Sequence, residues 1–166
     1  RVNSDLVGKV INIASRSAKF ITKGDSLLSA DLANTELWQQ GIDAGKQIAK
    51  HYEERDYSKA MREIMALADA TNEYFDAAEP WKLAKQEDTA AQAVAISSQC
   101  INMFAQIMTY LAPVLPQTVV KAEAFLNTSL SWEQEPTPLL SHEINKFKAM
   151  MSRVDSDKVE AMVEAQ

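Results

Sequence analysis

The stretch from residue 56 to residue 81, D-Y-S-K-A-M-R-E-I-M-A-L-A-D-A-T-N-E-Y-F-D-A-A-E-P-W, decides the fold that the sequence predicts. Apolar residues recur in it every three or four positions, which is typical of one long amphipathic helix. Asp56 suits the N-cap position, and Pro80 ends the helix because the residue before a proline disfavours α conformation. The apolar face consists of Ala60, Met61, Ile64, Met65, Leu67, Ala68, Tyr74 and Phe75.

The same periodicity predicts helices on both sides of this stretch. Trp132 and the two prolines that follow it interrupt the pattern, and residues 127–140 are predicted to form an irregular connector. Gly41 and Gly45 lie one turn apart and indicate a close approach between two helices, although each glycine costs roughly 1 kcal/mol in helix propensity. The further helices are expected over residues 5–21, 34–54, 89–111, 116–126 and 156–165.

These helices predict an all-α fold, an antiparallel helical bundle of about five helices followed by a short C-terminal helix. The chain has 166 residues, of which 46% are hydrophobic, and this is enough for one domain with a closed core. We expect a single domain over residues 1–166. Its main bundle spans residues 1–126, and residues 127–166 hold the connector and the C-terminal helix.

The composition and the motifs exclude several classes of protein. Cys100 is the only cysteine, and His51 and His142 are far apart in the sequence, so we expect neither a disulfide framework nor a closed zinc site. No apolar run is long enough to span a bilayer. The sequence also has no glycine-rich phosphate loop, no metal-ligand spacing and no nucleophile elbow. It therefore predicts no catalytic residue and no metal ligand.

Basic residues are concentrated at the start of the chain. The formal net charge is −6, which argues against a general nucleic-acid binder. The first 23 residues, however, contain Asp5 as their one acidic residue beside five basic ones: Arg1, Lys9, Arg16, Lys19 and Lys23. Lys9, Asn12, Arg16 and Lys19 recur at steps of three and four, so they form one stripe on the predicted helix. Such a stripe fits a small, directed contact with an anion, although composition alone favours an ordinary polar helix face.

A tryptophan directly follows the proline that ends the long helix. Trp81 lies next to Pro80 and is followed by Lys82 and Lys85. One interpretation is a ring that folds back to cap the core of the bundle. The other is an exposed ring beside lysines, which would stack a base and contribute ~1–3 kcal/mol per base. The residues themselves leave both interpretations open.

Several segments together resemble the anticodon-binding domain of methionyl-tRNA synthetases, and the similarity runs through the whole chain. The Asn-x-Ala-Ser-Arg element occurs more loosely in related class I synthetases, whereas the proline–tryptophan pair in this register is specific to the methionine enzyme. The segments are N-I-A-S-R at 12–16, R-E-I-M-A-L-A at 62–68, E-P-W at 79–81, A-K-Q at 84–86, M-T-Y-L-A-P-V-L-P at 108–116 and F-K-A at 147–149.

The resemblance implies a helical bundle that receives the CAU anticodon of methionine tRNA. Trp81 corresponds to the ring on which the family stacks cytosine, and Pro80 shapes the loop that carries this ring. Asn12 and Arg16 correspond to the amide and the guanidinium that read the anticodon. Because the two residues are four positions apart, they share one side of the predicted helix.

The resemblance also implies supporting positions around this site. Asn72 and Asp76 match positions that tune the choice of anticodon. Some family members carry an asparagine one turn before the anticodon-reading amide, where this chain has Gly8. Attraction of the RNA phosphates, and most of the salt dependence of binding, would come from four lysines: Lys9, Lys19, Lys82 and Lys85.

The resemblance further implies a larger parent protein. In the family, ATP-dependent activation of the amino acid takes place in a separate Rossmann-type domain, whose H-I-G-H and K-M-S-K-S type motifs do not occur in residues 1–166. We therefore expect this segment to be inactive alone and to hold no cofactor, since ATP, and zinc in some relatives, belong to the missing domain. The implied partners are methionine tRNA, elongator and initiator, and the catalytic domain of the parent chain. We expect a cytoplasmic location, and neither DNA nor a membrane as a partner.

Two alternatives remain open on the sequence alone. The anticodon domain of a sister class I synthetase, for valine, leucine, isoleucine or cysteine, would share the bundle. A non-enzymatic helical protein-interaction module would instead use Trp81 as the anchor residue of a protein interface.

Overall fold

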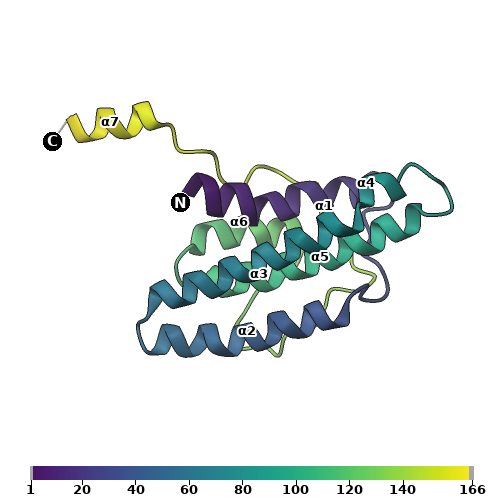
Figure 1. Ribbon diagram of the computed structural model, residues 1–166, viewed down its shortest axis with the longest axis horizontal. Helices are drawn as coiled ribbons and strands as arrows, with labels where there is room; N and C mark the ends of the chain where they lie inside the picture. Colours follow the sequence, from purple (N-terminus) through teal and green to yellow (C-terminus); the bar gives the residue numbers. More distant parts are fainter. Residues whose placement is uncertain (1, 165–166) are drawn as a thin grey trace.

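The computed structural model describes residues 2–164 and consists of helices joined by turns and one irregular connector (Figure 1). Within these residues the only β pairing is an isolated bridge between Leu27 and Glu143, so the predicted all-α fold is confirmed. In chain order the helices are η1 (Val2–Ile11), α1 (Asn12–Thr22), α2 (Thr35–Glu53), α3 (Tyr57–Ala78), α4 (Pro80–Leu83), α5 (Ala90–Leu111), α6 (Pro116–Leu126) and α7 (Ser156–Glu164).

Helix α5 is the centre of the bundle. It packs against α1, α2, α3 and α6, and α1 and α2 lie on opposite sides of the α3–α5 pair (Figure 1). A helix enclosed on several sides must be apolar around most of its circumference, as this one is. Ile101, Phe104 and Ile107 of α5 are fully buried, as is Ile64 of α3, while Leu67 is 2% exposed. The core predicted from periodicity is therefore confirmed.

The boundaries of α2 and α3 agree with the prediction because their causes are local. The Asn34 side chain accepts a hydrogen bond from the Leu37 backbone N–H at 2.9 Å, and Asp56 caps α3 in the same way at 3.2 Å. These side chains satisfy N–H groups that the first turn of a helix leaves unpaired. Helix α3 ends where Glu79 adopts a left-handed conformation, with φ 49°, immediately before Pro80.

The N-terminal helix differs from the prediction at its start. It begins at Val2 rather than near Asp5, and its first ten residues, η1, have π-helical geometry. The start of the helix contacts a residue that is distant in the sequence. The Asn3 side chain forms two hydrogen bonds with the Val154 backbone, at 2.9 Å and 2.6 Å. A contact between residues so far apart in the sequence leaves no trace in the local pattern.

Helix α4 is a second difference, since the periodicity does not predict it. Pro80 occupies its first position, where the missing N–H of proline carries no penalty. The turn is closed by a hydrogen bond from the Ala84 N–H to the Pro80 carbonyl at 2.9 Å. A single turn contains too few residues to show an apolar period, so only the chemistry of proline marks its place.

The connector contains no helix from residue 127 to residue 155. Helix α7 begins at Ser156, where the sequence predicts the C-terminal helix. Asn102 of α5 holds this segment against the bundle by two hydrogen bonds with the Leu139 backbone, at 2.6 Å and 3.1 Å. Beyond the connector, α7 extends away from the bundle, and its Met162 is 73% exposed (Figure 1).

Candidate nucleic-acid interface

Arg16 lies between α1 and α3 and is held there by three neighbours on α3. Its Cζ atom lies over the Phe75 ring, 4.3 Å from the ring centroid. Its Nη2 donates to the Asp76 carboxylate, and its Nη1 lies 3.5 Å from Oδ1 of Asn72. The structure therefore brings together three of the residues that the sequence singles out. The Arg16 side chain is 27% exposed, so part of it still faces solvent.

Asn72 is oriented by backbone groups on both sides. Its Nδ2 donates to the Ala68 carbonyl at 3.1 Å and to the Lys9 carbonyl at 3.4 Å. These two donations leave the carbonyl oxygen of the amide turned toward Arg16. Both polar atoms of the Asn72 side chain are thus bonded within the protein.

Trp81 combines the two arrangements that the sequence leaves open. Its ring packs on Phe75, with the centroids 5.9 Å apart and the planes at 42°. The residue is nevertheless 38% exposed, so the ring also reaches the surface. Pro80, which is buried, and the left-handed Glu79 turn the chain back so that the ring lies against α3. A ring supported on one side and open to solvent on another can stack a base.

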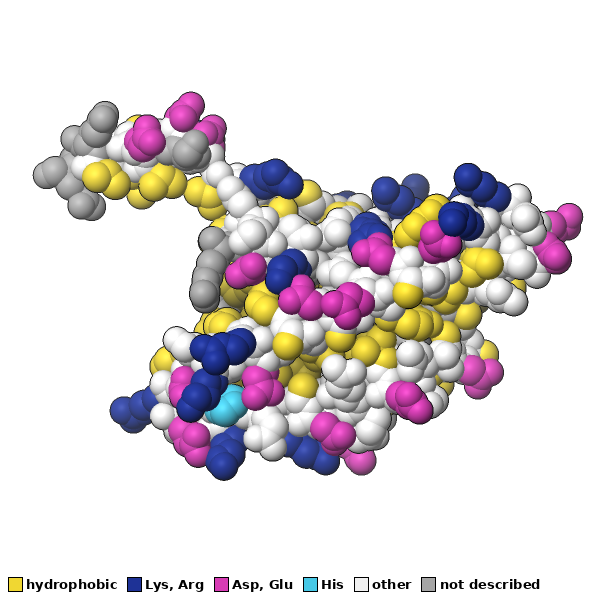
Figure 2. Space-filling view, in the orientation of Figure 1, with side chains coloured by type: hydrophobic (Ala, Val, Ile, Leu, Met, Phe, Trp, Pro, Cys, Tyr) yellow, Lys and Arg dark blue, Asp and Glu magenta, His cyan; other side chains and the backbone are white. Residues whose placement is uncertain are grey.

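The four predicted phosphate-binding lysines are not equivalent. Lys9 bonds Asp69 at 2.9 Å, which raises the pKa of its ammonium, and Lys82 bonds Glu79 at 2.7 Å. Lys19 and Lys85 are exposed and form no ion pair within residues 2–164. Figure 2 shows Lys and Arg side chains spaced along the edge of the molecule that α1 and α4 form, with carboxylates beside several of them.

Asn12 lines a groove beside α1. Its side-chain amide makes no hydrogen bond within the described part of the chain, so both its donor and its acceptor are free. The groove has a volume of about 440 Å³ and continues to Arg153 of the connector. Gly8 lies in the same groove, where a Cβ atom would stand 3.0 Å from the Asn3 carbonyl oxygen. An asparagine at this position would therefore crowd the backbone of η1.

The sequence pattern does not identify two residues that belong to this region. Phe75 follows the apolar period of α3 and is interpreted as core, although its ring touches both Arg16 and Trp81. Arg153 reaches the Asn12 groove only because the connector returns across the bundle, so no local pattern could identify it.

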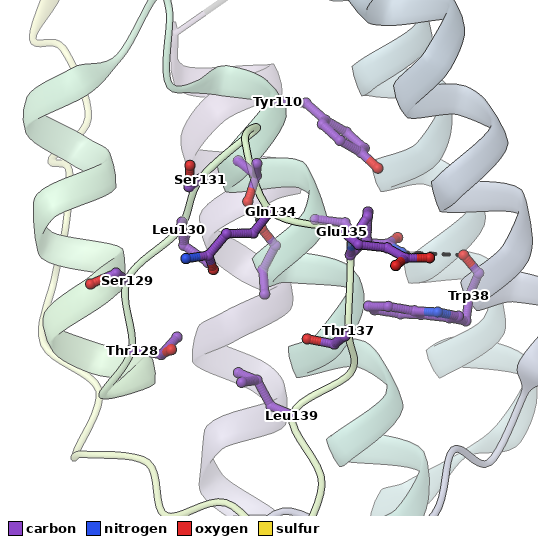
Figure 3. Close-up of a pocket in the computed structure, with 14 residues that line it drawn as sticks. Trp38, Tyr110, Thr128, Ser129, Leu130, Ser131, Gln134, Glu135, Thr137 and Leu139 are labelled. Carbon is purple, nitrogen blue, oxygen red and sulfur yellow. Dashed lines mark hydrogen bonds between the residues drawn. The ribbon is translucent and has the colours of Figure 1, made fainter.

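A separate pocket of about 120 Å³ lies under the connector (Figure 3). Trp38 of α2 and Tyr110 of α5 form one side, and residues 128–139 form the other. The Gln106 amide donates to the Trp38 carbonyl at 3.2 Å. None of the predicted anticodon-binding residues lines this pocket, so it is not part of the candidate interface.

Few other groups of the described residues could bind a metal ion or take part in a reaction. In residues 2–164, no three His, Cys, Asp or Glu side chains are grouped so that they could hold a metal ion. Burial raises the pKa of the Cys100 thiol to about 12, so at neutral pH this residue behaves as a small hydrophobe. Nε2 of His51 lies 3.1 Å from the Glu63 carboxylate between α2 and α3. No described helix is both long enough and apolar enough to cross a bilayer.

The bundle and its edge define a class of protein. An aromatic ring supported beside an oriented arginine is the combination with which small domains bind unpaired bases of RNA. The family model described as the anticodon binding domain of methionyl tRNA ligase matches residues 28–161, and the chain belongs to this family. The resemblance seen in the sequence is thereby confirmed, and the sister synthetases and the protein-interaction module are set aside.

Solved structures of Mycobacterium tuberculosis methionyl-tRNA synthetase share the fold. One, bound by methionyl-adenylate, has a TM-score of 0.82 and 19% identity over 90% of this chain and 32% of that chain. A second, in complex with methionyl-adenylate, has a TM-score of 0.82 and 20% identity over 92% and 32%. The free form has a TM-score of 0.73 and 19% identity over 90% and 34%. The chain thus spans about a third of the length of these synthetases.

Proposed function

We propose that this domain reads the CAU anticodon of methionine tRNA, both elongator and initiator. The observation that carries the proposal is that the Arg16 guanidinium and the Trp81 ring contact the same Phe75 ring. A stacking surface and a hydrogen-bonding group are thereby held at a fixed separation. Recognition of an unpaired base needs both, since stacking supplies affinity and the base edge supplies identity.

Cytosine fits the chemistry of this edge. In the proposed complex it stacks on Trp81, and Arg16 donates to its N3 and O2 acceptors. The N4 amino group donates to the Asn12 carbonyl oxygen or to a backbone carbonyl. Uracil presents O4 and N3–H instead, which reverses donor and acceptor. A fixed site would then leave polar groups unpaired, at a cost of about 1–3 kcal/mol for each lost buried bond.

The surrounding charges support a directed contact. Lys19 and Lys85, which have no carboxylate partner within residues 2–164, are the lysines best placed to attract phosphates. Lys9 and Lys82 would first have to leave Asp69 and Glu79. Asn72 and Asp76 tune the choice of anticodon by fixing Arg16, and Pro80 sets the place of Trp81.

The parent protein is proposed to be a cytoplasmic methionine–tRNA ligase. Its ATP-dependent step, and zinc where a relative carries it, would reside in a catalytic domain outside residues 1–166. The segment alone is expected to carry out no methionine-dependent exchange between pyrophosphate and ATP. Such exchange by the purified segment would contradict this division of labour.

The test is the binding of two RNA hairpins that differ only in carrying CAU or UAU in the loop. Trp81→Ala should weaken binding of the CAU hairpin by ~1–3 kcal/mol, about 5- to 150-fold in Kd. It should also reduce the preference for CAU over UAU, because the stacked base is held less firmly. Fluorescence anisotropy titrations of the folded variants measure both effects.

Trp132→Ala is the matched control for this experiment. Trp132 is 37% exposed, almost the same as Trp81, and it packs on Tyr110 with centroids 4.9 Å apart. It lies on the connector, so its loss should leave hairpin binding unchanged. Equal losses from the two variants, or full discrimination in a folded Trp81→Ala protein, would refute the proposed function.

A further inference from the structure

Phe75 lies at the point where the proposed anticodon site meets the core. The residue is 4% exposed, and three groups surround its ring. The Arg16 guanidinium carbon is 4.3 Å from its centroid, the Trp81 ring 5.9 Å and the Phe20 ring 6.2 Å. No other aromatic ring within residues 2–164 has an arginine over it.

We infer that Phe75 is a positioning residue for anticodon discrimination, an inference that rests on the proposed function. A guanidinium is attracted to the face of an aromatic ring, and it loses this attraction on an aliphatic surface. Asn72 and Asp76 lie on the same face of α3 as Phe75. Together they orient the planar group: the ring sets its tilt, while the amide and the carboxylate set its rotation.

The same ring also sets the place of the stacking surface. Glu79 and Pro80 turn the backbone sharply after α3, so Trp81 lies back on Phe75 at an angle of 42°. An aliphatic side chain at position 75 would offer a smaller and rounder support. Trp81 and Arg16 would then move independently, and the site would distinguish less well between cytosine and uracil.

The experiment compares Phe75→Leu with Phe125→Leu in the 166-residue chain. Phe125 is also 4% exposed, lies on α6 and pairs with Phe104 and Phe147, away from Arg16 and Trp81. The two substitutions remove the same atoms from sites of equal burial, so they should lower the Tm by similar amounts. The hairpins with CAU and UAU loops are the probes, measured where both variants are folded.

Phe75→Leu should weaken binding of the CAU hairpin about fivefold, as expected from loss of a cation–π contact, and should lower the preference for CAU over UAU. Phe125→Leu should change neither quantity. A double-mutant cycle adds a readout that a purely structural role would not move. In an Arg16→Ala background, Phe75→Leu should cost clearly less than fivefold, because the group it positions is gone.

Three results would overturn the inference. Phe75→Leu could bind both hairpins as the parent chain does, Phe125→Leu could lose as much affinity, or the Phe75→Leu loss could be the same in both backgrounds. If Arg16→Ala and Trp81→Ala also leave binding unchanged, the proposed function itself fails. If those two variants weaken binding while Phe75→Leu does not, only the positioning role fails.

Discussion

Arg16 and Lys19 lie three positions apart on α1, and the structure gives them different surroundings. The guanidinium of Arg16 is held by Asn72, Phe75 and Asp76. Lys19 is exposed and forms no ion pair within residues 2–164. A held group can distinguish one base edge from another, whereas a freely moving ammonium attracts any phosphate.

This difference predicts two separate effects on RNA binding. Arg16→Ala should lower affinity for the CAU hairpin more than for the UAU hairpin, by about 1–3 kcal/mol for the lost base contact. Lys19→Ala should weaken both hairpins equally and flatten the salt dependence of log K by roughly 0.7–0.9, the slope of one phosphate contact. Titrations of both hairpins over a range of salt concentrations separate the two effects. Equal behaviour of the two variants would count against a base-reading role for Arg16.

At the scale of single helices, the packing of α2 against α5 shows why glycine is required at Gly45. The Tyr110 hydroxyl of α5 donates to the Gly41 carbonyl of α2 at 2.7 Å. A Cβ atom at Gly45 would lie 2.5 Å from the same hydroxyl oxygen. The predicted close approach is therefore confirmed, and it brings a polar side chain of one helix onto the backbone of the other.

Gly45→Ala should accordingly destabilise the bundle. Alanine gains about 1 kcal/mol in helix propensity, but the clash with the buried Tyr110 ring should cost about 1–3 kcal/mol and break its hydrogen bond. Urea unfolding should therefore show a lower midpoint. Gly24→Ala is the control, because its Cβ would make only an ordinary contact at 3.7 Å with the Ile21 carbonyl oxygen. A Gly45→Ala protein as stable as the parent chain would show that α2 and α5 separate without penalty.

The elements also show what could be predicted from the sequence and what could not. Asp56 and Pro80 mark the ends of α3 because capping and proline sterics act within a few residues. At the start of η1, Asn3 bonds the Val154 backbone, and local patterns do not contain that contact. Phe75 was interpretable only as core, since an apolar period does not reveal which neighbour a buried ring supports.

At the scale of the whole molecule, burial keeps one cysteine thiol and three tyrosine hydroxyls in their neutral form. Burial raises the pKa of Cys100 from its ordinary 9.0 to about 12, and of Tyr110 from 10.0 to about 12. Tyr52 and Tyr74 are shifted to about 12 in the same way. Between about pH 9 and pH 12 the folded chain therefore holds more protons than the unfolded chain.

The free energy of unfolding should consequently fall as the pH rises from about 9 toward 12. Urea midpoints measured between pH 8 and pH 11 test this. Cys100→Ala should reduce the fall between pH 9 and pH 10, where the thiol of the unfolded chain titrates first. A stability that does not fall above pH 10 would contradict the buried, neutral state of these groups.

The paired hydrogen bonds between Asn3 and Val154 also indicate how the chain can be circularly permuted. They place two points near opposite ends of the chain within bonding distance, so a short linker could join them in place of α7. New ends could then be opened in the exposed turn at Gly24. Exposed turns tolerate such cuts when the original ends lie close together. A circular permutant of this kind would keep each bundle helix intact. It would remove the chain connection between α1, which carries Arg16, and α2.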